Sequence, residues 1–168
     1  MAELWDILDE KGSATGRLHQ RGEPMGDGEY HLTVYVWIEN DSGEFLISQR
    51  SQNKSFPNMW ECTGGNAIAG DDSLTTALKE TNEELGIALA PQSGRIIKHQ
   101  LRKCVCHHCL ADMWLFKQNV DISTVRLAPD ETQGAMWANR DEINRMIAEG
   151  TFTTWGLFAD MDELFGEE

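Results

Sequence analysis

The hydrophobic residues of this chain fall into short segments that are rich in β-branched and aromatic side chains. The clearest covers residues 31–38, which we expect to form a central strand. The polar residues 40–43 are typical of a turn, so residues 44–50 are predicted to pair with this strand as a hairpin. Further strands are predicted in three later segments, at residues 95–101, 111–116 and 135–138.

Two segments in the second half of the chain show helical periodicity. Between residues 74 and 85 the apolar positions recur at helical spacing, and Gly86 is typical of a helix end. A second helix is predicted at residues 140–149, with Asn139 as its cap and Gly150 as its end. With the strands, these helices predict a mixed α+β fold.

The two ends of the chain are expected to add a hairpin and a helix. Residues 1–20 contain two short segments around a glycine turn, which suits a β-hairpin. Residues 154–165 are amphipathic, and Thr154 is a suitable helix cap. With 168 residues the chain is large enough for one buried core and short for two, so residues 1–168 are expected to form a single domain.

The chain is strongly acidic, with a formal net charge of -14. The acidic residues are scattered over the sequence, and such an acidic surface repels nucleic acid, so no nucleic-acid partner is expected. A negatively charged small molecule would bind only where divalent cations and local basic side chains reverse the field. No apolar run approaches the roughly 20 residues of a membrane-spanning helix, and the N-terminus lacks a signal-like segment, so a cytoplasmic protein without a membrane partner is predicted.

Cysteines and histidines form one dense run late in the chain: Cys104, Cys106, His107, His108 and Cys109. Its composition is typical of metal binding, but neighbouring side chains on an extended segment point to alternate faces. We therefore do not expect all of them to converge on one ion. Cys62 stands apart and is interpreted as a small buried hydrophobe.

Three carboxylates gather near the end of the first predicted helix. Glu80, Glu83 and Glu84 are three or four residues apart, so they project from one side of the helix within about one turn. A solvated acidic face would show the same pattern. However, the helix C-terminus disfavours anions and favours bound cations, and the preceding Gly64 and Gly65 allow a backbone carbonyl to approach a metal. An oxygen-rich group of this kind suits magnesium or manganese.

From Gly65 to Ile87 the sequence resembles the Nudix box, G-x5-E-x7-R-E-U-x-E-E-x-G-U, in which U is an aliphatic residue. Six fixed positions match at the required spacing: Gly65, Glu80, Glu83, Glu84, Gly86 and Ile87. Three positions depart from it, with Asp71 in place of Glu, Lys79 in place of Arg and Thr81 in place of an aliphatic residue. In the family the first Glu and the Arg brace the loop and the helix. Asp71 and Lys79 preserve their charges but shorten one arm and lose the bidentate fork of arginine, so a looser support of the helix is expected.

The resemblance implies a fold and an activity. The fold is the Nudix fold, a mixed β-sheet sandwiched between α-helices, over roughly residues 30–150. The activity is metal-dependent hydrolysis of a diphosphate linkage in a nucleoside diphosphate-type small molecule. The implied cofactor is Mg2+, with Mn2+ as an alternative.

The resemblance also implies roles for individual residues. Glu80 and Glu84 are expected to be the principal metal ligands, with Glu83 as a further ligand or a water-activating base, and the Gly65 carbonyl completing the shell. A loop carboxylate often supplies the general base in the family, and the pair Asp130 and Glu131 is the best-placed candidate here, with Glu131 preferred of the two. A solvated turn is an equal alternative for this pair.

Arg50 and Lys54 are predicted to contact the phosphates of the substrate, although a surface role for Lys54 is an equal alternative. Large aromatic residues at strand positions are more often part of the core than of a binding site. We therefore assign to the core the residues Trp60, Trp114 and Trp137.

Two other functions stay open at this point. The N-terminal segment resembles the start of isopentenyl diphosphate isomerase, and His31 matches one of its metal histidines, but Gly65 and Ala67 stand where the isomerase has its cysteine and another histidine. A non-catalytic Nudix ligand sensor is the second alternative, which the departures at Lys79 and Thr81 allow. A homodimer through the N-terminal hairpin is also considered.

Overall fold

The computed structural model of the chain describes residues 2–103 and 108–166. The elements follow in this order: β1 (Leu4–Leu8), β2 (Ala14–Gln20), β3 (His31–Glu39), β4 (Phe45–Arg50), β5 (Trp60–Glu61), β6 (Thr63–Asn66), α1 (Ser73–Leu85), β7 (Gly94–Lys103), β8 (His108–Lys117), β9 (Thr132–Ala138), α2 (Arg140–Glu149) and α3 (Met161–Phe165), with 3-10 turns at Pro91–Ser93 and Ile122–Thr124. Seven strands form one sheet, and β1 and β2 form a separate hairpin. The predicted α+β class is confirmed.

Strand β3 lies at the centre of the sheet, as its sequence predicts. It runs parallel to β8 and antiparallel to β4 and β6, which makes the sheet mixed. Strand β7 pairs with β8 at one edge, while β5 and β9 both pair with β4. Val34, Val36 and Trp37 of β3 are fully buried, because both faces of this strand are covered.

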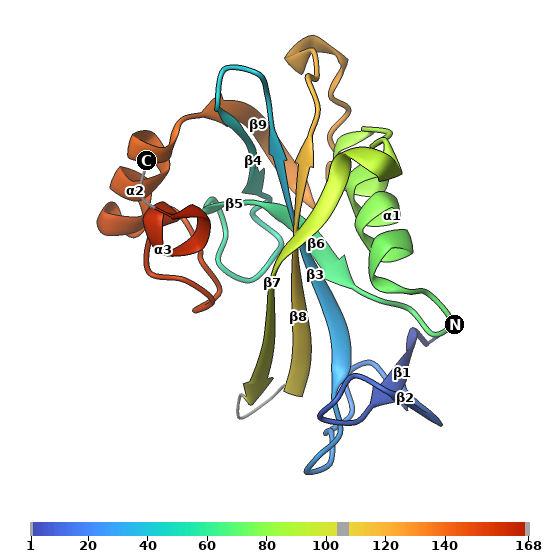
Figure 1. The fold of residues 1–168 in the computed structure, drawn as a ribbon. Coiled ribbons are helices and arrows are strands. Elements are labelled where there is room, and N and C mark those ends of the chain that lie inside the picture. The colour runs from blue at the N-terminus through green and yellow to red at the C-terminus, as the bar shows by residue number, and fades with distance from the viewer. Residues whose placement is uncertain (1, 104–107, 167–168) are drawn as a thin grey trace.

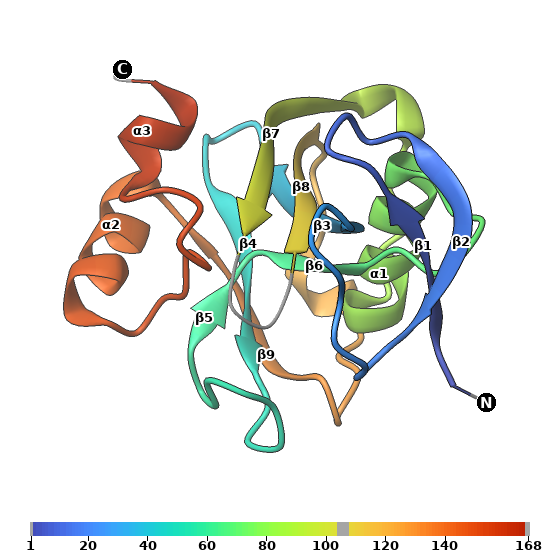
Figure 2. The same ribbon diagram turned by 90° about the horizontal axis from the view of Figure 1, so that it is seen from below.

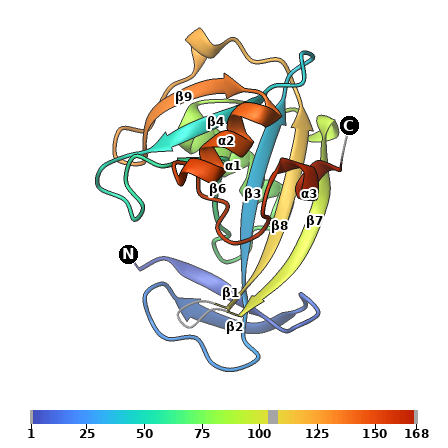
Figure 3. The same cartoon turned by 90° about the vertical axis from the view of Figure 1, so that its left-hand side faces the viewer.

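The helices cover both faces of the sheet (Figures 1 and 3). Helix α1 packs Ala77 and Leu85 against Val34 and Val36 on one face. On the other face α2 and α3 cover a second core around Trp37. The arrangement is a sandwich of helices around a mixed sheet, as predicted.

The N-terminal hairpin lies on the same side of the sheet as α1 (Figure 2). Its first strand is joined to the chain before β3 by hydrogen bonds between Leu8 and Tyr30, at 2.7 and 3.0 Å. The buried Trp5 ring stacks on His19 at 5.7 Å and on His31 at 4.2 Å between ring centroids. His31 therefore packs in the hairpin contact.

The helix predicted at residues 154–165 is wrong in its first half. Trp155 and Gly156 have positive φ angles of 54° and 69°, which a right-handed helix does not accommodate. Helix α3 begins only at Met161, where the side chain of Asp160 accepts a hydrogen bond from the Glu163 amide and caps it.

Two further predictions concern the run of cysteines and histidines and the absence of membrane-spanning helices. Most of the cysteine and histidine run, residues 104–107, lies outside the described residues, while Cys109 is buried on β8. Among the described residues, no helix is long and apolar enough to cross a membrane.

Candidate active site

Helix α1 is set in place by signals at both of its ends. The side chain of Asp72 accepts a hydrogen bond from the Thr75 amide at 2.7 Å, and Gly86 ends the helix with a φ of 67°. The apolar residues of α1 face the sheet, and its three glutamates differ in how far they are exposed to solvent. Glu84 is buried, Glu80 is partly buried, and Glu83 is exposed.

The three departures from the family motif are accommodated locally. Lys79 Nζ donates to Asp71 Oδ2 at 2.6 Å, so the shorter acid and the lysine still meet. Thr81 is fully buried, and its hydroxyl donates to the Ala77 carbonyl at 2.8 Å. A buried hydroxyl that bonds to the preceding helical turn leaves no unpaired polar group. What the departures remove from the support of the helix is therefore the bidentate hydrogen bonding of an arginine.

The glycine pair of β6 makes close contacts that exclude side chains. A Cβ atom at Gly64 would lie 2.2 Å from the Val34 carbonyl oxygen. At Gly65 it would lie 2.4 Å from the carboxylate carbon of Glu80 and would push this carboxylate away. The two glycines therefore let α1 and its acidic residues sit directly against β6.

Three carboxylates and one lysine lie together at the end of α1. Glu84 accepts a hydrogen bond from the Thr63 hydroxyl, and its Oε1 lies 3.6 Å from Lys54 Nζ. The same ammonium group pairs with Glu131. Lys54 thus bridges the helix and the loop before β9. Glu80 lies close enough to feel the charges of all three of these groups.

The loop that carries Glu131 is fastened to the helix. The Ala128 amide donates to the Glu84 carbonyl at 3.1 Å, which satisfies a free carbonyl at the helix end. The Ser51 hydroxyl donates to the Asp130 carbonyl at 2.7 Å. These bonds bring Glu131 to the carboxylates of α1, from which it is far in sequence.

The electrostatics of this group favour a bound cation. Burial, followed by the charges of Glu84 and Glu83, raises the pKa of Glu80 to about 7. Burial also raises the pKa of Glu84, against the opposing effects of Thr63 and Lys54. Carboxylates in this situation resist ionisation unless positive charge is brought to them, and Lys54 supplies only one unit.

Arg50 is not brought to the carboxylates of α1. Its guanidinium is buried and donates to Glu61 at 2.9 and 3.0 Å, to the Ser55 carbonyl at 2.6 Å and to the Ser55 hydroxyl at 3.1 Å. Burial raises the pKa of Glu61 to about 7, because desolvation outweighs the attraction of Arg50, and the charge of Glu84 raises it further.

The oxygen donors of this site suit Mg2+ or Mn2+ in chemical type. Glu80 packs on Gly65 in a cradle that a side chain would fill, and the raised pKa values mark a deficit of positive charge. Among residues 2–103 and 108–166, no three acidic, histidine or cysteine side chains converge closely enough to hold one ion. Chelation therefore requires the side chains of α1 to turn toward a common point.

Sequence reasoning missed three residues that belong to this region: Glu61, Thr63 and Trp155. Thr63 and Glu61 lie on strands too short to show a pattern, and Trp155 lies in a segment whose sequence pattern predicts a helix. The aromatic residues assigned to the core pack there, since Trp114 and Trp137 lie beside α1 and Trp60 lies against the other core.

Comparison with known proteins agrees with this architecture. A family model described as the NUDIX domain matches residues 29–160. A Nudix hydrolase of Listeria monocytogenes that is described as uncharacterized is 33% identical over 152 residues, covering 89% of this chain and 88% of that protein. An isopentenyl-diphosphate Delta-isomerase of Pectobacterium atrosepticum is 26% identical over 155 residues, covering 89% and 84%.

The fold has a counterpart among solved structures. The crystal structure of DR0079 from Deinococcus radiodurans matches with a TM-score of 0.71 over 90% of this chain and 92% of that chain. At 20% identity this likeness concerns the fold alone. With the family model covering most of the chain and the Nudix helix built as described, the protein belongs to the Nudix hydrolase family.

Proposed function

We propose that this protein hydrolyses a diphosphate linkage in a nucleoside diphosphate-type small molecule, with Mg2+ or Mn2+ as its cofactor. The observation that carries the proposal is the group formed by Glu80, Glu84, Glu131 and Lys54. Partly buried like charges are costly, and a protein keeps them together where they bind a cation or react.

The residues have distinct parts in this proposal. Glu80, Glu83, Glu84 and the Gly65 carbonyl would hold the cation, which supplies neutralisation of the diphosphate oxygens and a more acidic water. Lys54 would contact a phosphate, because its ammonium group already lies among the carboxylates and a bound cation would release it from Glu84.

Glu131 is the proposed general base, with Glu83 as the alternative. It is exposed and lies on a loop fastened to the end of α1, so it can accept a proton from water next to a bound diphosphate. The donors of Arg50 are engaged by Glu61 and Ser55. In this proposal Arg50 therefore holds the loop at residues 51–59, and Lys54 makes the direct contact with the phosphates.

The test is an assay for phosphate or mononucleotide release from a panel of diphosphate-linked compounds, with and without Mg2+. The native protein is compared with Glu84→Gln and with Glu149→Gln, which makes the same change at an exposed position of α2. We expect Mg2+-dependent release that Glu84→Gln abolishes and Glu149→Gln leaves intact.

The panel includes isopentenyl diphosphate, with isomerisation monitored separately. Isomerisation without hydrolysis would move the protein to the isomerase alternative, which the relative from Pectobacterium motivates. Absence of any turnover, combined with saturable binding of a panel member, would support the ligand sensor.

A further inference from the structure

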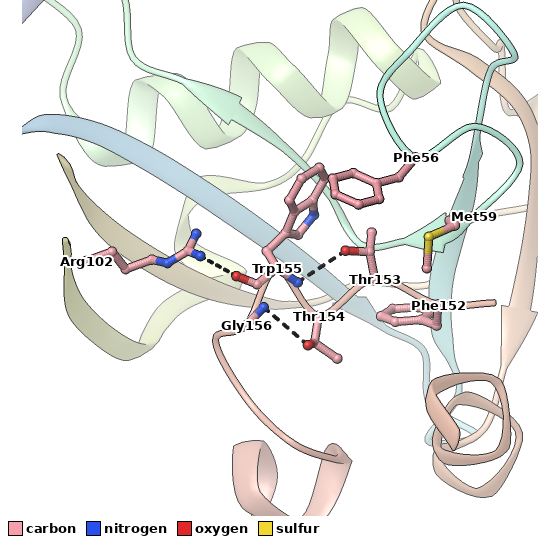
Figure 4. A pocket seen from close by; sticks show the side chains of 8 residues that line it. All are labelled: Phe56, Met59, Arg102, Phe152, Thr153, Thr154, Trp155 and Gly156. Atoms are coloured by element: carbon pink, nitrogen blue, oxygen red, sulfur yellow. Dashed lines mark hydrogen bonds between the residues drawn. The ribbon is translucent and has the colours of Figure 1, made fainter. Parts of the chain in front are cut away.

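A pocket of about 430 Å³ is lined by residues of two loops, at 56–59 and 152–156, and by Arg102 of β7 (Figure 4). Its walls are mainly apolar and include Phe56, Met59, Phe152 and Trp155, with Arg102 at one side. The volume falls in the range of sites that hold small organic groups. The roles proposed above for the carboxylates and Lys54 leave this space unused.

The backbone around the pocket is strained. Among the described residues, the non-glycine residues with positive φ are Phe56 at 53°, Asn58 at 64° and Trp155 at 54°. Two of the three line the pocket, and their rings meet edge to face with centroids 5.5 Å apart. Bulky residues in this conformation cost free energy, and such strain concentrates at sites of ligand binding.

Phe56 is also unusually open to solvent for a large apolar residue. It is 55% exposed, although the ring of Trp155 offers it a partner. More than half of the residue stays exposed in spite of this contact. The ring is therefore available to a molecule that enters the pocket.

The pocket is connected to the carboxylates by two links. Lys54 and Phe56 lie on the same short loop, so the residue that meets Glu84 and Glu131 is two positions from the pocket wall. In addition, Trp155 Nε1 donates to Glu61 Oε2 at 3.2 Å, and Glu61 lies close enough to Glu84 and Lys54 for their charges to affect its pKa. One ligand can therefore place a diphosphate at Lys54 and its other end in the pocket.

The polar side chains in the pocket wall offer more donors than acceptors, because Arg102 only donates whereas the hydroxyls of Thr153 and Thr154 do both. Arg102 provides a guanidinium, part of which donates to the Trp155 carbonyl. The hydroxyl oxygens of Thr153 and Thr154 accept from the amides of Trp155 and Gly156 at 3.3 Å, which leaves the hydroxyl hydrogens to donate. The eight residues that line the pocket include no carboxylate and no side-chain amide.

We propose that this pocket binds the organic group joined to the diphosphate, and that it selects a planar ring bearing a carbonyl. The flat faces of Trp155 and Phe56 suit a ring, and polar side chains that offer more donors than acceptors suit a carbonyl over an amino group. Phe56 and Trp155 are thus specificity-determining residues. This assignment rests on the proposed hydrolysis only in so far as the ligand is expected to carry a diphosphate.

The first measurement is the steady-state kinetics with Mg2+ of three compounds that share a terminal diphosphate. Inosine and adenosine diphosphates differ by a carbonyl against an amino group, and isopentenyl diphosphate lacks a ring. We expect a KM for inosine diphosphate at least fivefold below that for adenosine diphosphate, and a still higher KM for isopentenyl diphosphate. Phe56→Ala should raise the KM for inosine diphosphate about tenfold and change kcat less than twofold.

The control is Leu18→Ala, which removes an aliphatic side chain that is 53% exposed on the N-terminal hairpin. It should leave all three KM values unchanged. Equal KM values for the three compounds, or an unchanged KM in Phe56→Ala, would overturn the assignment while leaving hydrolysis intact.

A second measurement separates the pocket from the chemistry. Inosine, which has no phosphate, is titrated without metal into the native protein, Phe56→Ala and Leu18→Ala, with NMR chemical shifts as the readout. We expect saturable shifts that Phe56→Ala weakens at least fivefold. This result without turnover of any diphosphate would retain the pocket and refute hydrolysis, whereas absence of inosine binding would refute the pocket.

Discussion

Helix α1 and the loops at residues 51–59 and 152–156 form the two parts of the candidate site, and they are specified in different ways. The helix depends on local signals, the Asp72 cap and the Gly86 end. The loops depend on long-range contacts, above all those of Glu61 with Arg50 and Trp155. Local signals thus fix the helix glutamates proposed to hold the cation, whereas tertiary contacts fix Glu131, Lys54 and the residues proposed for selectivity.

The largest expected effect comes from a substitution that removes the contact between Arg50 and Glu61, which supports the loops. Arg50→Met leaves Glu61 buried without its charged partner, which should lower the free energy of unfolding by about 3–5 kcal/mol. The loss should be smaller at pH 6 than at pH 8, because Glu61 can then take up a proton. Urea denaturation at both pH values measures it. A loss below about 1 kcal/mol at pH 8 would contradict the role given to this pair.

The helix side is tested by activity. Glu84→Gln keeps the shape of a residue that accepts from Thr63 but removes the charge, so kcat should fall at least about 100-fold, or about 2.7 kcal/mol. Steady-state assays with the substrate found in the panel measure this. If Glu84→Gln raised only KM, as expected for Phe56→Ala, the division between the two parts of the site would be wrong.

A pH effect on stability distinguishes the cation-free carboxylates from ordinary surface acids. The pKa values of Glu61 and Glu80 are raised from 4.5 to about 7, so the folded protein binds these protons more tightly than the unfolded chain. Their contribution is therefore fully present below about pH 4.5 and is lost as the pH rises through about 7. The loss is at most about 3 kcal/mol per group, and less for the partly exposed Glu80.

Thermal unfolding between pH 5 and pH 8 without metal checks this contribution. Glu80→Gln should flatten the pH dependence, and Mg2+ should stabilise the native protein more at pH 8 than at pH 6. Identical pH profiles for the native protein and Glu80→Gln would show that Glu80 ionises normally.

The smallest effect is expected at the motif departures. Lys79→Arg restores the residue of the family motif next to Asp71, with which Lys79 already pairs at 2.6 Å. Because this lysine is about half exposed, the change should alter stability by less than about 0.5 kcal/mol and kcat by less than twofold. A large gain in kcat would mean that the lysine limits the enzyme.

The sequence predicts the parts of the molecule that local patterns determine. Central strand β3, helix α1 and helix α2 with its Asn139 cap follow from periodicity and end signals. Local patterns do not reveal the approach of Glu131 to Glu84, because the bonds that fasten its loop join residues distant in sequence. Only the family resemblance suggests a loop carboxylate as the base.

The loops could not be predicted in the same way. Residues 154–160 have a helical pattern of apolar positions, but the left-handed backbone at Trp155 and Gly156 is imposed by packing beside Glu61 and Arg102. From the sequence, Arg50 is predicted to contact a phosphate. Its burial with Glu61 depends on the pairing of β4 with β5, which no local pattern reveals.

The most direct test of the central claim is a calorimetric titration of Mg2+ into the metal-free protein at pH 8. We expect saturable binding that Glu84→Gln weakens at least tenfold and that Glu149→Gln leaves unchanged, because the carboxylates at the end of α1 are the proposed cation site. No saturable binding, or binding of equal strength in Glu84→Gln, would contradict the account.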